Sequence, residues 1–181
     1  MSHAKALACA VFAIGWAFTL LGVGKLPERE NTEWRYWADI PLTYEEQEAL
    51  HNAADEMGVP YELACSVVWK ETTFRNIYGD GGAAYGYMQV HPSQHWDRMQ
   101  ELGVTDLFDP ASNFRVGCHY LAELLNRYGD THMALMAYNA GPGNADIFWF
   151  SEGIYTNEYS REVINFMNET FYNGEIGGAN G

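Results

Sequence analysis

The sequence is 181 residues long and carries a formal net charge of −14 at pH 7. Such an acidic chain is unsuited to the polyanionic backbone of DNA or RNA, so nucleic acid is excluded as a partner. The negative charge also gives it no electrostatic attraction to an anionic cell wall or membrane surface. Hydrophobic residues make up 48% of the chain, enough for one domain with a packed core.

An uncharged, apolar run occupies residues 6–24, between Lys5 and Lys25. Its length is close to the roughly 20 residues that cross a bilayer, and a Gly-Val-Gly tripeptide at its end resembles a signal-peptide cleavage site. We therefore expect residues 1–24 to be a signal peptide or an N-terminal membrane anchor, and the sequence leaves both open. Either one exports the remaining chain to a periplasmic or extracellular location, and the anchor would hold it at the cytoplasmic membrane.

Three further segments follow this leader. Residues 25–42 are polar with interspersed aromatic side chains, and we expect a linker or a strap lying over the domain. Residues 43–172 carry the helix and turn signals of one folded domain. Residues 173–181 are rich in Gly and Asn and predict a flexible tail.

The predicted elements of the domain are mostly helices, so the expected fold class is mainly α. In chain order they are a helix from a capping box at Thr43 to Met57, a helix that begins at Pro60 and carries Glu71 near its end, a glycine-rich loop with a short hairpin over 75–90, a helix from Pro92 to about Leu102, a helix capped by Asp109 and closed by Gly129, a short helix over 131–140, and a last helix capped by Thr156 that runs to Tyr172.

Two cysteines lie in the domain, Cys65 and Cys118. In an oxidising compartment they could form a disulfide, and two separate buried thiols are equally compatible with the sequence. Neither Cys-x-x-Cys nor His-Glu-x-x-His occurs, so we expect no metal and no cofactor.

Glu71 is the candidate catalytic residue. It follows a mostly apolar stretch at the end of a predicted helix, where poor solvation and the negative helix pole both disfavour the charged carboxylate. A carboxylic acid that stays protonated near neutral pH is the general acid required for cleaving a glycosidic bond. Most glutamates at helix ends are solvated surface residues, so the assignment of Glu71 as a catalytic residue depends on the motifs that accompany it.

Four motifs accompany this glutamate at characteristic spacing. They are Glu71-Thr72-Thr73-Phe74, Ala84-Tyr85-Gly86-Tyr87-Met88-Gln89, Asp109-Pro110-Ala111-Ser112-Asn113 with Gly117-Cys118-His119-Tyr120-Leu121, and Ala137-Tyr138-Asn139-Ala140-Gly141, with a later Thr156-x-x-Tyr159. Over about residues 43–170 the chain resembles the soluble lytic transglycosylase family, which has a lysozyme-like fold and is related to the g-type lysozymes. The resemblance implies a helical, lysozyme-like domain with a small hairpin beside an active-site cleft.

The resemblance also implies roles for individual residues. Glu71 would be the catalytic acid, and the glycan would be bound by Tyr85, Gly86, Gln89, His91, Tyr138, Asn139 and Tyr159. Glutamine amides and tyrosines suit sugars, because they hydrogen-bond hydroxyl and N-acetyl groups or stack on sugar rings. Simpler structural roles are expected for the helix cap Asp109 and for residues that suit packing, which are Met88, Gly117, Tyr120 and Leu121. Asn139 also suits a turn.

The chain departs from the family pattern at three positions. Asp80 replaces a common serine in the loop and resembles the aspartate of g-type lysozymes, His91 replaces a common methionine, and Tyr155 replaces a frequent glutamate. Asp80 is therefore a candidate second carboxylate that could hold a water molecule. An aspartate that bonds its own backbone in a glycine-rich turn is the simpler, structural interpretation.

We expect an enzyme that cleaves the MurNAc–GlcNAc β-1,4 bond of peptidoglycan and leaves 1,6-anhydroMurNAc ends, with Glu71 as acid and then base. Two further hypotheses are lysozyme-type hydrolysis of the same bond assisted by Asp80, and a non-catalytic glycan-binding envelope module. The partners are peptidoglycan glycan strands, and either envelope or virion machinery fits as the biological setting.

Overall fold

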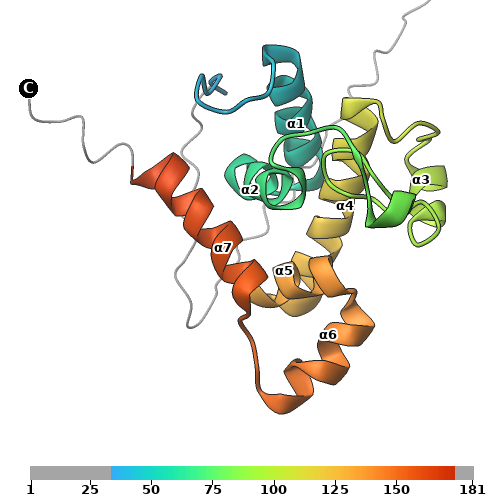
Figure 1. Ribbon diagram of the computed structural model, residues 1–181, viewed down its shortest axis with the longest axis vertical. Coiled ribbons are helices and arrows are strands. Elements are labelled where there is room, and N and C mark those ends of the chain that lie inside the picture. The colour runs from blue at the N-terminus through green and yellow to red at the C-terminus, as the bar shows by residue number, and fades with distance from the viewer. Residues whose placement is uncertain (1–33, 174–181) are drawn as a thin grey trace, which may run out of the picture. The chain divides into compact units, whose positions relative to one another are not determined.

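The computed structural model of the protein describes residues 34–173 (Figure 1). The expected leader over residues 1–24, the first half of the linker 25–42 and all but the first residue of the tail 173–181 lie outside the described residues. Within residues 34–173, no helix has both the length and the apolar character needed to cross a membrane.

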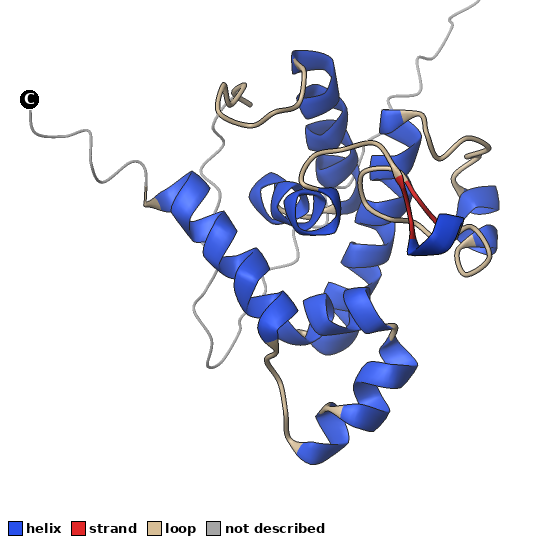
Figure 2. Cartoon of the chain, viewed as in Figure 1, coloured by secondary structure: helices blue, strands red, loops and turns tan. Residues whose placement is uncertain are grey.

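The described chain is predominantly helical, as the sequence predicts (Figure 2). Its elements in chain order are α1 (Tyr44–Met57), α2 (Tyr61–Thr72), β1 (Tyr78–Gly79), η1 (Asp80–Gly82), β2 (Ala84–Tyr85), α3 (Trp96–Glu101), α4 (Pro110–Tyr128), α5 (Thr131–Ala140), α6 (Pro142–Phe148), η2 (Phe150–Glu152), α7 (Glu158–Met167) and the π-helical turn η3 (Asn168–Tyr172). The two strands pair antiparallel, with Tyr78 opposite Tyr85 and Gly79 opposite Ala84.

Several predicted helix boundaries are confirmed by their caps. Thr43 and Glu46 form the reciprocal capping box of α1, and Gly58 ends that helix in the left-handed conformation. The Asp109 side chain accepts a hydrogen bond from the Ser112 backbone at the start of α4, which Gly129 closes.

Other boundaries differ from the prediction. Pro92 begins a turn rather than a helix, because His95 has a non-helical backbone, and α3 starts only at Trp96. Pro142 opens the unpredicted helix α6, since proline suits the first helical position. The last helix is capped by Asn157 instead of Thr156, because the Asn157 side chain accepts from the Ser160 backbone N–H.

The helices enclose one core, in which α1 packs on α4, α2 on α7 and α4 on α5. Residues 34–42 form a strap held to this core. The fully buried Gln47 of α1 exchanges hydrogen bonds with the Trp37 backbone, and the Trp37 ring packs edge-on against Phe171. Cys65 and Cys118 are separate, free and buried thiols, so they do not form the disulfide; burial raises the pKa of each to about 12.

The loop of residues 84–90 is fastened to three helices by side chains that bond its backbone. The fully buried Asn113 of α4 accepts from the Met88 N–H at 2.9 Å and donates to the Tyr85 carbonyl at 2.9 Å. Thr72 of α2 bonds the Tyr87 carbonyl at 3.0 Å, and Tyr138 of α5 bonds the Met88 carbonyl at 2.9 Å. The loop therefore has a fixed position although it contains almost no regular structure.

Two glycines allow this close fit. Gly86 has φ +74, and a Cβ there would overlap the Asn113 amide and the Leu107 carbonyl. A Cβ on Gly117 of α4 would overlap the Met88 side chain, which is fully buried. Gly117 thus allows the loop to lie directly on α4.

Replacement of Asn113 should destabilise the domain strongly. Asn113→Ala leaves the Met88 N–H and the Leu107 carbonyl without a partner in a dry site, and each such group costs about 1–3 kcal/mol. We expect the free energy of unfolding in urea to fall by about 3 kcal/mol or more. Asn126→Ala, at an exposed position on the same helix, is the control and should have little effect. Equal stability of the two variants would contradict the proposed clamp.

Candidate active site

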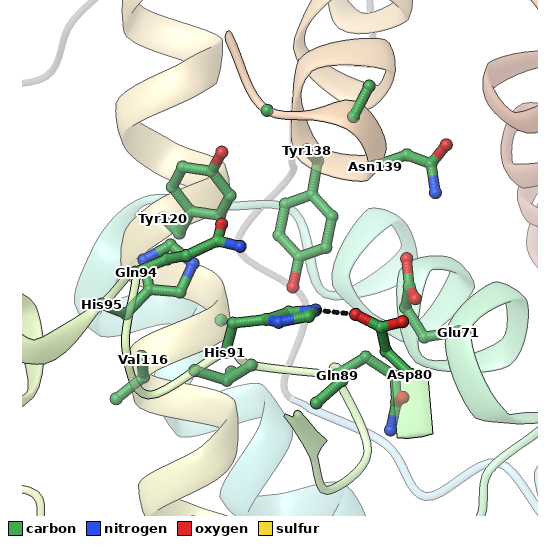
Figure 3. A pocket seen from close by; sticks show the side chains of 15 residues that line it. Glu71, Asp80, Gln89, His91, Gln94, His95, Val116, Tyr120, Tyr138 and Asn139 are labelled. Carbon is green, nitrogen blue, oxygen red and sulfur yellow. Dashed lines mark ion pairs between the residues drawn. The ribbon is translucent and has the colours of Figure 1, made fainter. Parts of the chain in front are cut away.

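A cleft of about 370 Å³ runs between α2, the hairpin, the turn after β2, α4 and α5 (Figure 3). Most of its lining side chains are polar or aromatic. The lining residues are Glu71, Asp80, Ala84, Gln89, Val90, His91, Gln94, His95, Val116, Gly117, Tyr120, Tyr138, Asn139, Ala140 and Gly141. Five of the predicted site residues thus line the same cleft as Glu71, namely Asp80, Gln89, His91, Tyr138 and Asn139.

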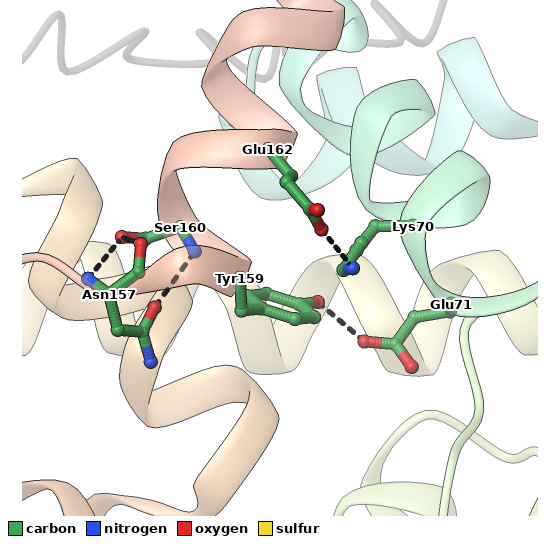
Figure 4. Close-up of polar contacts among 6 residues, drawn as sticks. All are labelled: Lys70, Glu71, Asn157, Tyr159, Ser160 and Glu162. Atoms are coloured by element: carbon green, nitrogen blue, oxygen red, sulfur yellow. Dashed lines mark hydrogen bonds and ion pairs between the residues drawn. The ribbon is translucent and has the colours of Figure 1, made fainter.

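Glu71 lies in the last turn of α2, as the sequence predicts, and faces the cleft half-buried. The Tyr159 hydroxyl of α7 donates a hydrogen bond to Oε1 of Glu71 at 2.5 Å (Figure 4). The adjacent Lys70 is paired with Glu162, also of α7. The packing of α2 against α7 therefore fixes the orientation of the carboxyl group.

Burial raises the pKa of Glu71 above its ordinary value and is the largest influence on it. Two weaker influences lower the pKa, because the Tyr159 hydrogen bond and the Lys70 charge both favour the ionised carboxylate. The net effect is a carboxyl group that holds its proton to a higher pH than an exposed glutamate does. This is the property expected from its apolar helix.

Gln89 lines the cleft, but its amide is largely occupied by the loop itself. Its Nε2 donates to the Gly86 carbonyl at 2.9 Å and to the Ile77 carbonyl at 3.2 Å. The side chain lies so close to Gly79 that a Cβ there would overlap it. In this geometry Gln89 braces the hairpin, and only its carbonyl oxygen remains uncommitted to these bonds.

Three predicted glycan-binding residues lie outside the lining of the cleft. Ala84 faces the cleft, so its strand neighbour Tyr85 points to the opposite face of the hairpin, where it packs with Tyr78 and Phe108. Gly86 is buried against Asn113, and Tyr159 is buried beneath Glu71. Their positions favour support of the loop and of Glu71.

The two departures in the loop region meet in the cleft. Nε2 of His91 lies 3.8 Å from Oδ2 of Asp80, within the range of an ion pair when the imidazole is protonated (Figure 3). Asp80 stands in the glycine-rich turn with φ +46, a left-handed conformation that aspartate tolerates better than most residues.

One wall of the cleft contains residues that sequence reasoning missed as site residues. His95 packs against Tyr120 with ring centroids 4.5 Å apart, and Tyr120 packs against Tyr138 at 5.2 Å. Burial, with a smaller contribution from the Arg98 charge, lowers the pKa of His95 to about 4, so its ring is neutral near pH 7. Tyr120 stood in a motif and could have been found there; Gln94 and His95 follow no motif.

The site therefore offers one carboxyl group with a raised pKa beside a row of aromatic rings. Such a row suits sugar rings, and the carboxyl group suits proton donation to a glycosidic oxygen. Within residues 34–173, no three His, Cys, Asp or Glu side chains are grouped so that they could hold a metal ion.

Comparisons with known proteins point to one family. Residues 48–152 match the family model described as the transglycosylase SLT domain. A transglycosylase of Enterobacteria phage PRD1 is 32% identical over 126 residues, which cover 70% of this chain and 44% of the phage protein. The membrane-bound lytic murein transglycosylase F of Desulfosudis oleivorans is 30% identical over 102 residues, covering 52% of this chain and 22% of that protein.

The fold is likewise similar to a solved structure. The 70 kDa soluble lytic transglycosylase of Escherichia coli superposes with a TM-score of 0.61 at 19% identity, covering 74% of this chain and 25% of that one. The chain thus spans less than half the length of these relatives. Because the family model covers more than half of the sequence, the chain belongs to the transglycosylase SLT domain family.

Proposed function

We propose that this protein is a peptidoglycan lytic transglycosylase that cleaves the MurNAc–GlcNAc β-1,4 bond and leaves 1,6-anhydroMurNAc ends. The observation that carries the proposal is Glu71, a carboxyl group whose pKa is raised by burial and which faces the cleft in a fixed orientation. Membership of the transglycosylase SLT domain family and the names of the relatives support the same activity.

The proposed reaction needs one acid that later becomes a base. Glu71 donates its proton to the glycosidic oxygen, the C1–O bond breaks, and the GlcNAc side leaves as an alcohol. The 6-hydroxyl of MurNAc then attacks C1 and gives up its proton to the Glu71 carboxylate. No water is consumed, and Glu71 ends the cycle protonated again.

Hydrolysis is the second candidate reaction, and the position of Asp80 in the cleft is the observation that favours it. In that reaction a water molecule attacks C1, a carboxylate accepts its proton, and the product has a free reducing end. A non-catalytic glycan-binding module is less well supported, since binding alone gives no reason for a half-buried carboxyl group with a raised pKa to face the cleft.

The setting of this activity is the cell envelope. We propose that the protein is exported through residues 1–24 and meets peptidoglycan outside the cytoplasm, free or anchored through residues 6–24. Relatives named as a phage transglycosylase and as a membrane-bound murein transglycosylase support an envelope or virion context.

The first test removes the proton from the proposed acid. Glu71→Gln keeps the shape of the side chain, so we expect a folded protein whose rate of glycan release from purified peptidoglycan falls by at least about 100-fold. Glu62→Gln, in the first turn of the same helix, is the matched control and should keep wild-type activity. An active Glu71→Gln variant would refute the assignment of the acid.

The second test concerns pH. A required protonated acid makes activity fall as pH rises through the pKa of Glu71, which lies above the ordinary value. Because the Tyr159 hydrogen bond lowers that pKa, Tyr159→Phe should raise it and move the alkaline limb of the kcat/KM profile to higher pH. Tyr155→Phe, at an exposed position, is the control. A limb that stays in place in Tyr159→Phe would show that this bond does not govern the acid.

The third test identifies the product by mass spectrometry. An anhydro end and a free reducing end differ by one water molecule, which gives each cleavage product an unambiguous mass. We expect anhydro ends from the wild-type protein and also from Asp80→Asn, because the 6-hydroxyl reaction needs only Glu71. Reducing ends from the wild type, together with a large loss of activity in Asp80→Asn, would establish hydrolysis instead.

A further inference from the structure

The Asp80 carboxylate is presented on a turn that gives it many orientations. Three glycines adjoin it, Gly79, Gly81 and Gly82, and glycine restricts the backbone least of all residues. Its side chain is 73% exposed. An exposed carboxylate has few contacts of its own, so the side chain that it faces bears on its direction.

His91, in contrast, has a fixed backbone. Its neighbour Val90 forms an isolated bridge with Tyr85, with both N–H···O bonds present at 2.9 and 3.0 Å, and Pro92 follows with a restricted backbone. The His91 side chain is only 26% exposed. His91 is thus the more buried member of the pair, and Asp80 is the more exposed one.

The two side chains face each other in the cleft that Glu71 also lines (Figure 3). Within the described residues, His91 is the one side chain with which Asp80 forms an ion pair. Both positions depart from the family pattern, and the structure shows that these departures are in contact. A substitution of one residue can therefore change the orientation of the other side chain.

We propose that His91 is a positioning residue that holds the Asp80 carboxylate away from the reacting sugar and so favours the anhydro product over hydrolysis. This inference rests on the proposed function. It concerns only the fate of the sugar after Glu71 has donated its proton.

Two reactions compete at that point for C1 of the MurNAc residue. If its 6-hydroxyl attacks, the C1–O6 bond forms, the hydroxyl proton passes to Glu71, and no water enters. If water attacks, a C1–OH bond forms, and a carboxylate such as Asp80 accepts the proton that water loses. With its Oδ2 held 3.8 Å from Nε2 of His91, the Asp80 carboxylate is less free to turn toward such a water molecule.

The test replaces His91 with the residue that the family commonly has. In His91→Met the carboxylate loses its partner, and we expect the ratio of reducing to anhydro ends to rise about two- to fivefold, the size of effect typical of an exposed ion pair. Borohydride treatment before mass spectrometry labels the reducing ends, since anhydro ends are not reduced. The assay uses purified peptidoglycan at mildly acidic pH.

Two further variants separate positioning from a general effect on the cleft. His91→Met combined with Asp80→Asn should return the ratio to the wild-type value, because the freed carboxylate is gone. His91→Lys places a positive charge at this position and should give the same ratio of reducing to anhydro ends as the wild type. Thermal unfolding checks each variant, and His91→Gln replaces His91→Met in the comparison if the latter does not fold.

Each outcome bears on the inference. An unchanged ratio in His91→Met and His91→Gln would overturn it, as would a raised ratio that persists in the double variant. Neither result affects the proposed function, because anhydro ends would still come from the wild type. A wild type that yields mainly reducing ends would overturn both this inference and the anhydro product, whereas a wild type that cleaves no glycan would refute the proposed function itself.

Discussion

The site depends on the attachment of one irregular loop to three helices. Residues 84–90 have almost no regular structure of their own, so their backbone groups need partners from elsewhere. Asn113 supplies two of them from a fully buried position, and Thr72 and Tyr138 supply one each. Because Thr72 directly follows Glu71 and Tyr138 lines the cleft, the same contacts that fold the loop also fix the distance between the acid and the opposite wall. Folding of the loop therefore also determines the geometry of the site.

Glu71 shows how opposing influences set the chemistry of one carboxyl group. Burial favours the protonated form, while the Tyr159 hydrogen bond and the Lys70 charge favour the ionised form. Burial is the largest of the three influences, so the pKa of Glu71 is raised overall. Lys70 is also paired with Glu162. The negative charge of Glu162 partly cancels the electrostatic effect of Lys70 on the pKa of Glu71. The orientation comes from α7, which contributes both Tyr159 and Glu162.

Local signals in the sequence predicted most of the helices, since capping boxes, first-turn prolines and closing glycines act within a few residues. They misplaced α3 because proline favours a turn as well as a helix start, and they missed α6 because Gly141-Pro142 looks like a terminator. The motifs placed Glu71, Gln89 and Tyr138 at the cleft. They could not reveal that the Gln89 amide bonds its own loop, that Asn113 is the central clamp, or that His95 faces the cleft, because these features depend on contacts between distant segments.

The distribution of polar groups has a consequence for recognition. Gln89 and Tyr138 have the chemistry to bond sugar hydroxyls, yet their hydrogens are engaged by the loop. The surface left for a glycan is therefore mainly the aromatic row of His95, Tyr120 and Tyr138, together with the exposed side chains of Gln94 and Asn139. Stacking on aromatic faces discriminates little between sugars with different hydroxyl arrangements. The position of a glycan strand along the cleft would therefore be set by a few polar contacts near Glu71. Asp80 and His91 line the cleft at that place.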